Sequence, residues 1–191
     1  MTRGREVEPR KIKRGGYDLL KNPVRMAADA AGETDVCGIC LETLPPTGAD
    51  FSRLTCCGKG MHLACTEELQ ASAYRNKCPM CRAPLPKSAL ENHRRVLQWA
   101  QRGKAWAMNM LADDYRDGRG VQMSQKKARL WYERAAEQGR VLAQYNFAVM
   151  HRDGQGGPVS MEQARIWFGR AAEQGFAEAQ CNLTTAFLLY T

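Results

Sequence analysis

The sequence predicts a chain built in two ways: a small, loop-rich module stabilised by metal ions, followed by an all-α solenoid of helix pairs. Seven of the eight cysteines and one of the three histidines form four close pairs within residues 37–81. After residue 100 the sequence repeats itself with a period of 36 residues, and a period in the mid-thirties indicates stacked helix pairs. A basic, weakly hydrophobic stretch over residues 1–35 predicts a disordered arm before both.

The four pairs are suited to binding metal. They are Cys37/Cys40, Cys56/Cys57, His62/Cys65 and Cys78/Cys81. Eight such donors suffice for two tetrahedral zinc ions, each closed by four Cys or His ligands. A closed site leaves no position for a catalytic water, so the predicted zinc ions are structural. Any chemistry would then be done by a partner that the metal-held surface recruits.

The composition predicts a chain that stays inside the cell. There is no run of about 18 apolar residues, the length needed to span a membrane, and no apolar stretch follows the basic N-terminus as in a secretory signal. We therefore expect a reducing compartment, cytoplasmic or nuclear, in which paired cysteines bind metal rather than form disulfides. No membrane partner is expected.

The net charge of +8 is concentrated at the N-terminus, where residues 1–25 carry 8 Lys and Arg against 3 Asp and Glu. The densest part, Arg10 to Arg14, has the composition of a nuclear-import or nucleic-acid-binding patch. A solvated tail is the interpretation we favour, because no aromatic stacking platform accompanies the charge. A basic nucleic-acid binder is thus a minor alternative, and nucleic acid is not an expected partner.

Three segments follow from these patterns: the arm at 1–35, the cysteine-rich module at 36–86 and a helical region at 88–191. Pro84 and Pro86 disfavour helix at the exit of the module. Ser88 and Glu91 then form a capping box for a first helix. Serine N-caps and glycine stops predict the helices that follow. The expected helices are 89–102, 105–116, 124–138, 142–152, 160–174 and 177–190.

Several positions recur at the 36-residue spacing. Ala135-Ala-Glu-Gln-Gly139 returns as Ala171-Ala-Glu-Gln-Gly175, Trp131 as Trp167, and a Gly-x-Gly turn separates the two helices of each pair. This pattern resembles the Sel1-like repeat, a relative of the tetratricopeptide repeat. The resemblance implies a helical solenoid whose concave face binds other proteins, and the alternative is a scaffold without a partner of its own.

The cysteine-rich module resembles the RING finger at both ends, in Cys37-Gly-Ile-Cys40-Leu-Glu and Cys78-Pro-Met-Cys81-Arg-Ala-Pro. The PHD finger is the second candidate, but Asn76 stands where that family usually has an aromatic residue. Either family implies a small α+β fold with cross-braced ligation, in which alternate pairs share an ion. The two expected sites are Cys37, Cys40, His62 and Cys65, and Cys56, Cys57, Cys78 and Cys81.

One ligand departs from the commonest RING pattern. That pattern has a histidine two residues after Cys57, where this chain has Lys59. A lysine ammonium has no lone pair for zinc. The adjacent Cys56 is therefore the expected substitute.

The RING resemblance implies an E3 ubiquitin ligase that recruits a ubiquitin-conjugating enzyme and its ubiquitin. The positions that match the family's contact residues are Ile39, Leu69 and Pro79, and Arg82 matches the "linchpin" that holds the loaded ubiquitin. Each also has a structural interpretation, as core residue, turn residue or solvated charge. A non-catalytic, zinc-binding interaction scaffold is the alternative function.

The remaining chemistry-bearing residues do not form a pattern. His93 and His151 lie in expected helices without cysteine partners, so we expect packing or surface roles. Cys181 is alone in a helix with no activating base. We expect it to be buried as a small hydrophobic residue, and do not expect a ligase that carries ubiquitin on its own cysteine.

Overall fold

A computed structural model describes residues 36–44, 51–70 and 76–188 of the chain. All of these residues belong to one compact unit, Gly32–Thr191. The expected basic arm at 1–35 lies outside the described residues, as do residues 189–191 at the end of the last expected helix. None of the described helices is long and apolar enough to cross a membrane.

The cysteine-rich module contains little regular structure. Strands β1 (Phe51–Arg53) and β2 (Gly60–His62) pair antiparallel, with Ser52 opposite Met61, and helix α1 (Leu63–Gln70) follows directly. Its buried apolar cluster is small and consists of Cys37, Leu44 and Met61, with Ile39, Leu54 and Cys65 partly buried against it. So small a core contributes little hydrophobic stabilisation.

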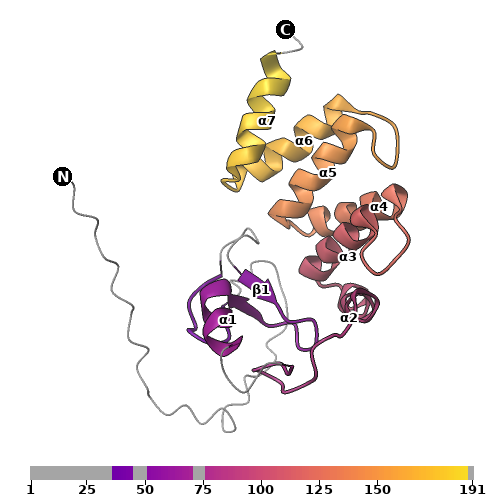
Figure 1. Cartoon of the computed structure of the whole chain (residues 1–191). Helices are drawn as coiled ribbons and strands as arrows, with labels where there is room; N and C mark the ends of the chain where they lie inside the picture. The colour runs from indigo at the N-terminus through magenta and orange to yellow at the C-terminus, as the bar shows by residue number, and fades with distance from the viewer. Residues whose placement is uncertain (1–35, 45–50, 71–75, 189–191) are drawn as a thin grey trace, which may run out of the picture. The chain divides into compact units, whose positions relative to one another are not determined.

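In the rest of the described chain, the secondary-structure elements are all helices, joined by loops (Figure 1). They are α2 (Ala89–Gln101), α3 (Ala105–Asp117), α4 (Gln125–Glu137), α5 (Val141–Asp153), α6 (Met161–Glu173) and α7 (Ala177–Leu188). The bounds differ from the expected ones by one or two residues. Their ends have the expected chemistry, since the Ser124 and Ser160 side chains accept hydrogen bonds from the third residue of α4 and α6. Gly118 and Gly154 end α3 and α5 in the left-handed conformation.

Each helix packs against the next, and one continuous apolar core runs from Val96 in α2 to Ala179 in α7. Fully buried alanines such as Ala135 and Ala171 allow close approach of the helices. The larger buried side chains, among them Tyr132 and Phe168, fill the space between them.

One cysteine does not lie where we expected it. Cys181 is exposed on α7, so the prediction that it is buried is wrong. The buried side of α7 is the one that carries Ala179 and the partly buried Leu183. Successive helical residues differ by about 100°, so a residue two positions from both points away from that side.

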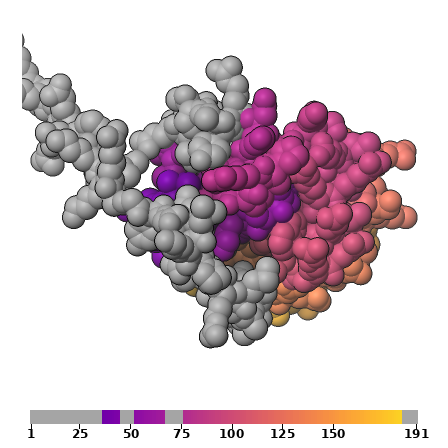
Figure 2. Space-filling view, turned by 90° about the horizontal axis from the view of Figure 1, so that it is seen from below, coloured from indigo at the N-terminus to yellow at the C-terminus, as the bar shows by residue number. Residues whose placement is uncertain are grey.

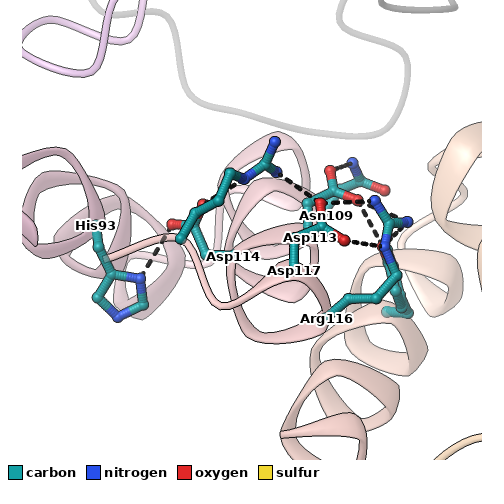
Figure 3. A network of polar contacts seen from close by, with 8 residues as sticks. His93, Asn109, Asp113, Asp114, Arg116 and Asp117 are labelled. Atoms are coloured by element: carbon teal, nitrogen blue, oxygen red, sulfur yellow. Dashed lines mark hydrogen bonds and ion pairs between the residues drawn. The ribbon is translucent and has the colours of Figure 1, made fainter. Parts of the chain in front are cut away.

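A buried histidine joins α2 to α3 (Figure 3). His93 Nδ1 lies 3.0 Å from Asp114 Oδ2, and both side chains are buried. The His93 ring also meets Tyr115 edge-on, with ring centroids 5.4 Å apart. Asp114 receives a second partner from Arg119, whose Nε is 3.4 Å from Oδ1. His93 thus has the packing role that we expected of it.

A second polar group joins α3 to α4. The Tyr132 hydroxyl donates to Asp113 Oδ1 at 2.5 Å, and the Arg116 guanidinium donates to the Tyr132 oxygen at 2.7 Å. Burial raises the pKa of both Asp113 and Tyr132 above their ordinary values. Buried polar groups of this kind are satisfied by one another and contribute to a specific helix pairing.

Glycine is required where the loop between α5 and α6 crosses the first turn of α4. Gly156 has φ of 72°, and a Cβ at this position would lie 2.4 Å from the carbonyl oxygen of Gln125. We therefore expect Gly156→Ala to lower the free energy of unfolding by about 2–3 kcal/mol, measured by urea denaturation.

The matched control is Gly169→Ala, because a Cβ at Gly169 within α6 would meet nothing within 4 Å. Alanine is a better helix former than glycine, so the free energy of unfolding of this variant should rise by about 0.5–1 kcal/mol. Equal losses in the two variants would contradict the close packing at Gly156.

Candidate metal centre

Two loops of the cysteine-rich module have the same backbone conformation. In each, the residue after the second cysteine has a positive φ, 62° at Leu41 and 60° at Arg82. Its N–H donates to the carbonyl of the first cysteine, at 3.1 Å from Leu41 to Cys37 and 2.9 Å from Arg82 to Cys78. Isolated bridges, Val36 with Thr43 and Lys77 with Pro84, close the two loops. Below we call these the first and second knuckle.

The knuckles direct backbone N–H groups at sulfur. Ile39 N lies 3.5 Å from Cys37 Sγ, and Met80 N and Cys81 N each lie 3.4 Å from Cys78 Sγ. Burial acts to raise the pKa of Cys37, but backbone hydrogen bonds from Cys40, His62 and Ile39 outweigh it and lower that pKa to about 6. At Cys78 burial and backbone hydrogen bonds oppose each other in the same way, and the pKa of Cys78 is also lowered. A thiolate is the form that ligates metal.

The β-hairpin and α1 supply the other donors. Cys56 and Cys57 lie in the turn between β1 and β2, His62 ends β2, and Cys65 is in the first turn of α1. The first knuckle bridges to this hairpin through Gly38 N, which donates to the Gly60 carbonyl at 3.0 Å. Elements far apart in sequence thus bring the donors together.

The eight donors form two groups. Group one is Cys37, Cys40, His62 and Cys65, and group two is Cys56, Cys57, Cys78 and Cys81. In each group all four donor atoms lie within 4.8 Å of one another. The structure therefore brings the first pair together with the third and the second pair with the fourth, as in a cross-braced fold.

The spacing within the groups suits a tetrahedral ion. Cys57 Sγ and Cys78 Sγ are 3.7 Å apart, and Cys40 Sγ is 3.3 Å from His62 Nδ1. Four donors at the zinc–sulfur bond length of about 2.3 Å would be separated by about 3.8 Å. Both groups could hold a metal ion, and thiolates with one imidazole are donors that zinc accepts.

Electrostatics within the groups favours a cation. Burial, together with the neighbouring sulfurs, raises the pKa of Cys57 to about 11 and that of Cys65 to about 12. The same two causes raise the pKa of Cys56. Several thiolates cannot be charged together at this distance without a positive partner, and a divalent ion would supply that charge.

The two knuckles touch. A Cβ at Gly38 would lie 2.8 Å from Cε of Met80, so the methionine of the second knuckle covers the glycine of the first. Ile39 and Pro79, which come from the two knuckles, are both half-buried. Arg82 is exposed, and its guanidinium makes no hydrogen bond or ion pair with another residue that the structure describes. Leu69 is within α1, but its side chain lies outside the described residues.

Sequence reasoning missed the residues that join group two to the helices. Thr55, which precedes Cys56, is buried and its hydroxyl donates to Asn92 Oδ1 at 2.9 Å. The Trp99 Nε1 donates to the Thr55 carbonyl at 2.9 Å. In Figure 2 the purple atoms of the cysteine-rich module lie directly beside pink atoms of the α2 region.

Comparison with known proteins identifies the helical part. The sequence model of the Sel1 repeat matches residues 107–139 and 141–176. These residues therefore match two Sel1 repeats, which confirms the Sel1-like pattern. The matched residues do not include the cysteine-rich module. No curated protein matches the chain significantly.

Two solved structures are similar to about half of this chain. A Sel1 repeat protein from Oxalobacter formigenes has 29% sequence identity and a TM-score of 0.50, and the match covers 52% of this chain and 41% of that one. A protective antigen of uropathogenic Escherichia coli with the SLR fold has 29% identity and a TM-score of 0.51, covering 52% of this chain and 21% of the antigen. This chain thus spans less than half the length of either protein.

The two donor groups predict the metal content. Purified protein should contain two zinc ions per chain by elemental analysis, and Cys78→Ser should lower this number to one or below. Chelation should unfold the module, because the metal supplies much of the folding free energy of such a small core.

Cys181→Ser serves as the control, since this exposed cysteine on α7 belongs to neither group. It should keep both ions. A wild-type chain with no zinc would contradict the assignment, as would a Cys78→Ser chain with full zinc content.

Proposed function

We propose that this chain is a RING-type E3 ubiquitin-protein ligase. Two structural zinc ions would hold the cysteine-rich module, the module would recruit a ubiquitin-conjugating enzyme, and the repeats would bind a substrate or adaptor protein. The observation that carries the proposal is the alternate pairing of the eight donors into two groups. This pairing distinguishes a cross-braced module from two separate zinc sites placed one after the other in sequence.

The surface of the knuckles supports recruitment. Ile39 and Pro79 lie on two loops that are in contact through Met80 and Gly38, so one partner could contact both. Leu69 is assigned to the same contact by its position in α1. Half-buried apolar side chains held on a stable backbone are suited to a small docking site.

Arg82 is the proposed linchpin. Its backbone is fixed by the second knuckle, where its N–H donates to the Cys78 carbonyl at 2.9 Å, while the side chain remains exposed. A planar guanidinium can donate to carbonyl groups of two proteins at once. The side chain could therefore bridge the conjugating enzyme and the ubiquitin that it carries.

The mechanism is one of orientation. The zinc ions, each with four protein ligands, would supply folding free energy and no catalytic water. The neutral amine of a substrate lysine would attack the thioester carbon to form the isopeptide bond. The carbon–sulfur bond would break, the sulfur of the conjugating enzyme would leave as a thiolate, and the amine proton would pass to water. The contacts at Ile39, Pro79 and Arg82 would restrict enzyme and ubiquitin to the geometry in which this attack succeeds.

The repeats would supply the partner for modification. A solenoid presents an extended surface relative to its mass, and such surfaces bind proteins. The Sel1 match favours protein binding whether or not ubiquitin is transferred. A non-catalytic scaffold that uses the same surface is therefore the second candidate function.

Self-ubiquitination separates the two candidates. With a panel of ubiquitin-conjugating enzymes, the wild-type chain should form ubiquitin conjugates, and Arg82→Ala should lower the rate by about 10- to 100-fold because the loaded ubiquitin is no longer held. The zinc content of Arg82→Ala should remain that of the wild type.

Arg94→Ala is the matched control, an exposed arginine on α2 outside the module. It should transfer ubiquitin at the wild-type rate. Wild-type protein that contains zinc yet forms no conjugate with any enzyme of the panel would favour the scaffold.

A further inference from the structure

Helix α2 has the same ends as the second helices of the two repeats. Its N-cap Ser88 accepts a hydrogen bond from the third residue of the helix, as Ser124 does in α4 and Ser160 in α6. These serines are 36 residues apart. At the other end Gly103, Gly139 and Gly175 follow at the same spacing, with φ of 82°, 81° and 84°.

The neighbours of α2 also repeat. A Cβ at Gly120 would lie 2.5 Å from the carbonyl of Ala89, the first residue of α2, as one at Gly156 would lie 2.4 Å from that of Gln125, the first residue of α4. The loop after α3 therefore crosses α2 as the loop after α5 crosses α4.

The contacts that α2 makes with the helix that follows it are repeated as well. His93 contacts Tyr115 of α3, and Arg129, 36 residues later, contacts His151 of α5 at 2.8 Å. By all three comparisons α2 is the second helix of an additional repeat. That repeat lies before the two that the Sel1 model matches.

Among the described residues before α2, no helix pairs with α2 as the first helix of this additional repeat, and residues of the cysteine-rich module at 36–86 precede it instead. In the next repeat, α3 is the first helix and α4 is the second. Tyr132 of α4 contacts α3 by donating a hydrogen bond to Asp113. Tyr132 is flanked on the same side of α4 by the fully buried Ala128 and Ala135. The corresponding residues of α2 are Asn92, Val96 and Trp99.

Two of these three α2 residues contact the cysteine-rich module. Asn92 and Trp99 both hydrogen-bond to Thr55. A Cβ at Gly58 would lie 3.4 Å from the Trp99 ring, so the ring packs on the turn that carries Cys56 and Cys57. In α4 the two positions hold small alanines that pack against a helix. In α2 they hold the larger Asn92 and Trp99, whose side chains reach the turn of the module.

We propose that the cysteine-rich module takes the place of the missing first helix and caps the solenoid. The turn from Thr55 to Gly58, held by the donors of group two, covers the side of α2 that a helix covers in the later repeats. A solenoid needs such a cap, because an uncovered terminal helix exposes its apolar side to water. This cap would join the two parts of the chain whether or not ubiquitin is transferred.

The cap links donor group two to the repeats. Cys56 and Cys57 belong to the turn that contacts α2, whereas within the described part of the chain no hydrogen bond joins a residue of group one to α2. Loss of the ligands in this turn releases Thr55 and Gly58. The amides of α2 then open more often than those of α6, which is covered on both sides by α5 and α7.

Hydrogen–deuterium exchange of the full-length chain, followed by mass spectrometry, tests the cap. Trp99→Ala should speed exchange in α2 by about tenfold or more, with α6 unchanged, because the contact with the turn is lost. Gln98→Ala, at the neighbouring exposed position of α2, should leave exchange at the wild-type rate. Wild-type exchange of α2 in Trp99→Ala would overturn the proposal, and so would an equal rise in α2 and α6.

A second variant tests the cap from the side of the module. Cys57→Ser should likewise speed exchange in α2 while α6 stays protected, and unchanged exchange in α2 would overturn the proposal. A wild-type chain that fails to transfer ubiquitin would contradict only the proposed function, because its α2 would still be protected from exchange. Asn92→Ala removes only the hydrogen bond to Thr55 and should give a smaller change in the same direction, so the test does not depend on how well Trp99→Ala folds.

Discussion

Convergence of eight Cys and His donors on two points is the constraint on which the N-terminal half of the described structure depends. The apolar cluster there has only three buried members, Cys37, Leu44 and Met61, and two strands of three residues add few hydrogen bonds. Neither can offset the conformational entropy of a loop-rich module. The backbone of both knuckles is arranged around sulfur, which is what a module held by metal rather than by a core requires.

The solenoid follows a different rule, because its helices are stabilised by packing against their neighbours. The junction is where the two rules meet, and a few residues make it: Thr55 on one side, and Asn92 and Trp99 on the other. A cation–π contact of Arg53 over Trp106, at 4.9 Å, adds to it. The cysteine-rich module and the repeats are thus joined by side-chain contacts as well as by the chain between them.

Much of this arrangement was predictable because its signals are local. Serine N-caps and glycine stops fixed the helix ends to within two residues, and spacing with family resemblance indicated how the donors divide. Contacts between side chains that are far apart in the sequence carry no such signal, which is why the hydrogen bond between Tyr132 and Asp113 was not foreseen. The burial of Cys181 was wrongly predicted because α7 has no clear apolar stripe. The additional repeat did have a signal, in Ser88 at the spacing of Ser124 and Ser160, but Asn92 and Trp99 replace the alanines that mark the pattern.

The left-handed backbone at Leu41 and Arg82 has a consequence for the choice of amino acid. Glycine adopts this conformation without penalty, whereas a residue with a Cβ loses about 1–2 kcal/mol there. The chain nevertheless has a leucine and an arginine at these two places, both exposed to solvent. Neither side chain repays the strain through burial. Any compensation for the strain at these two positions therefore comes from something other than burial of the side chain.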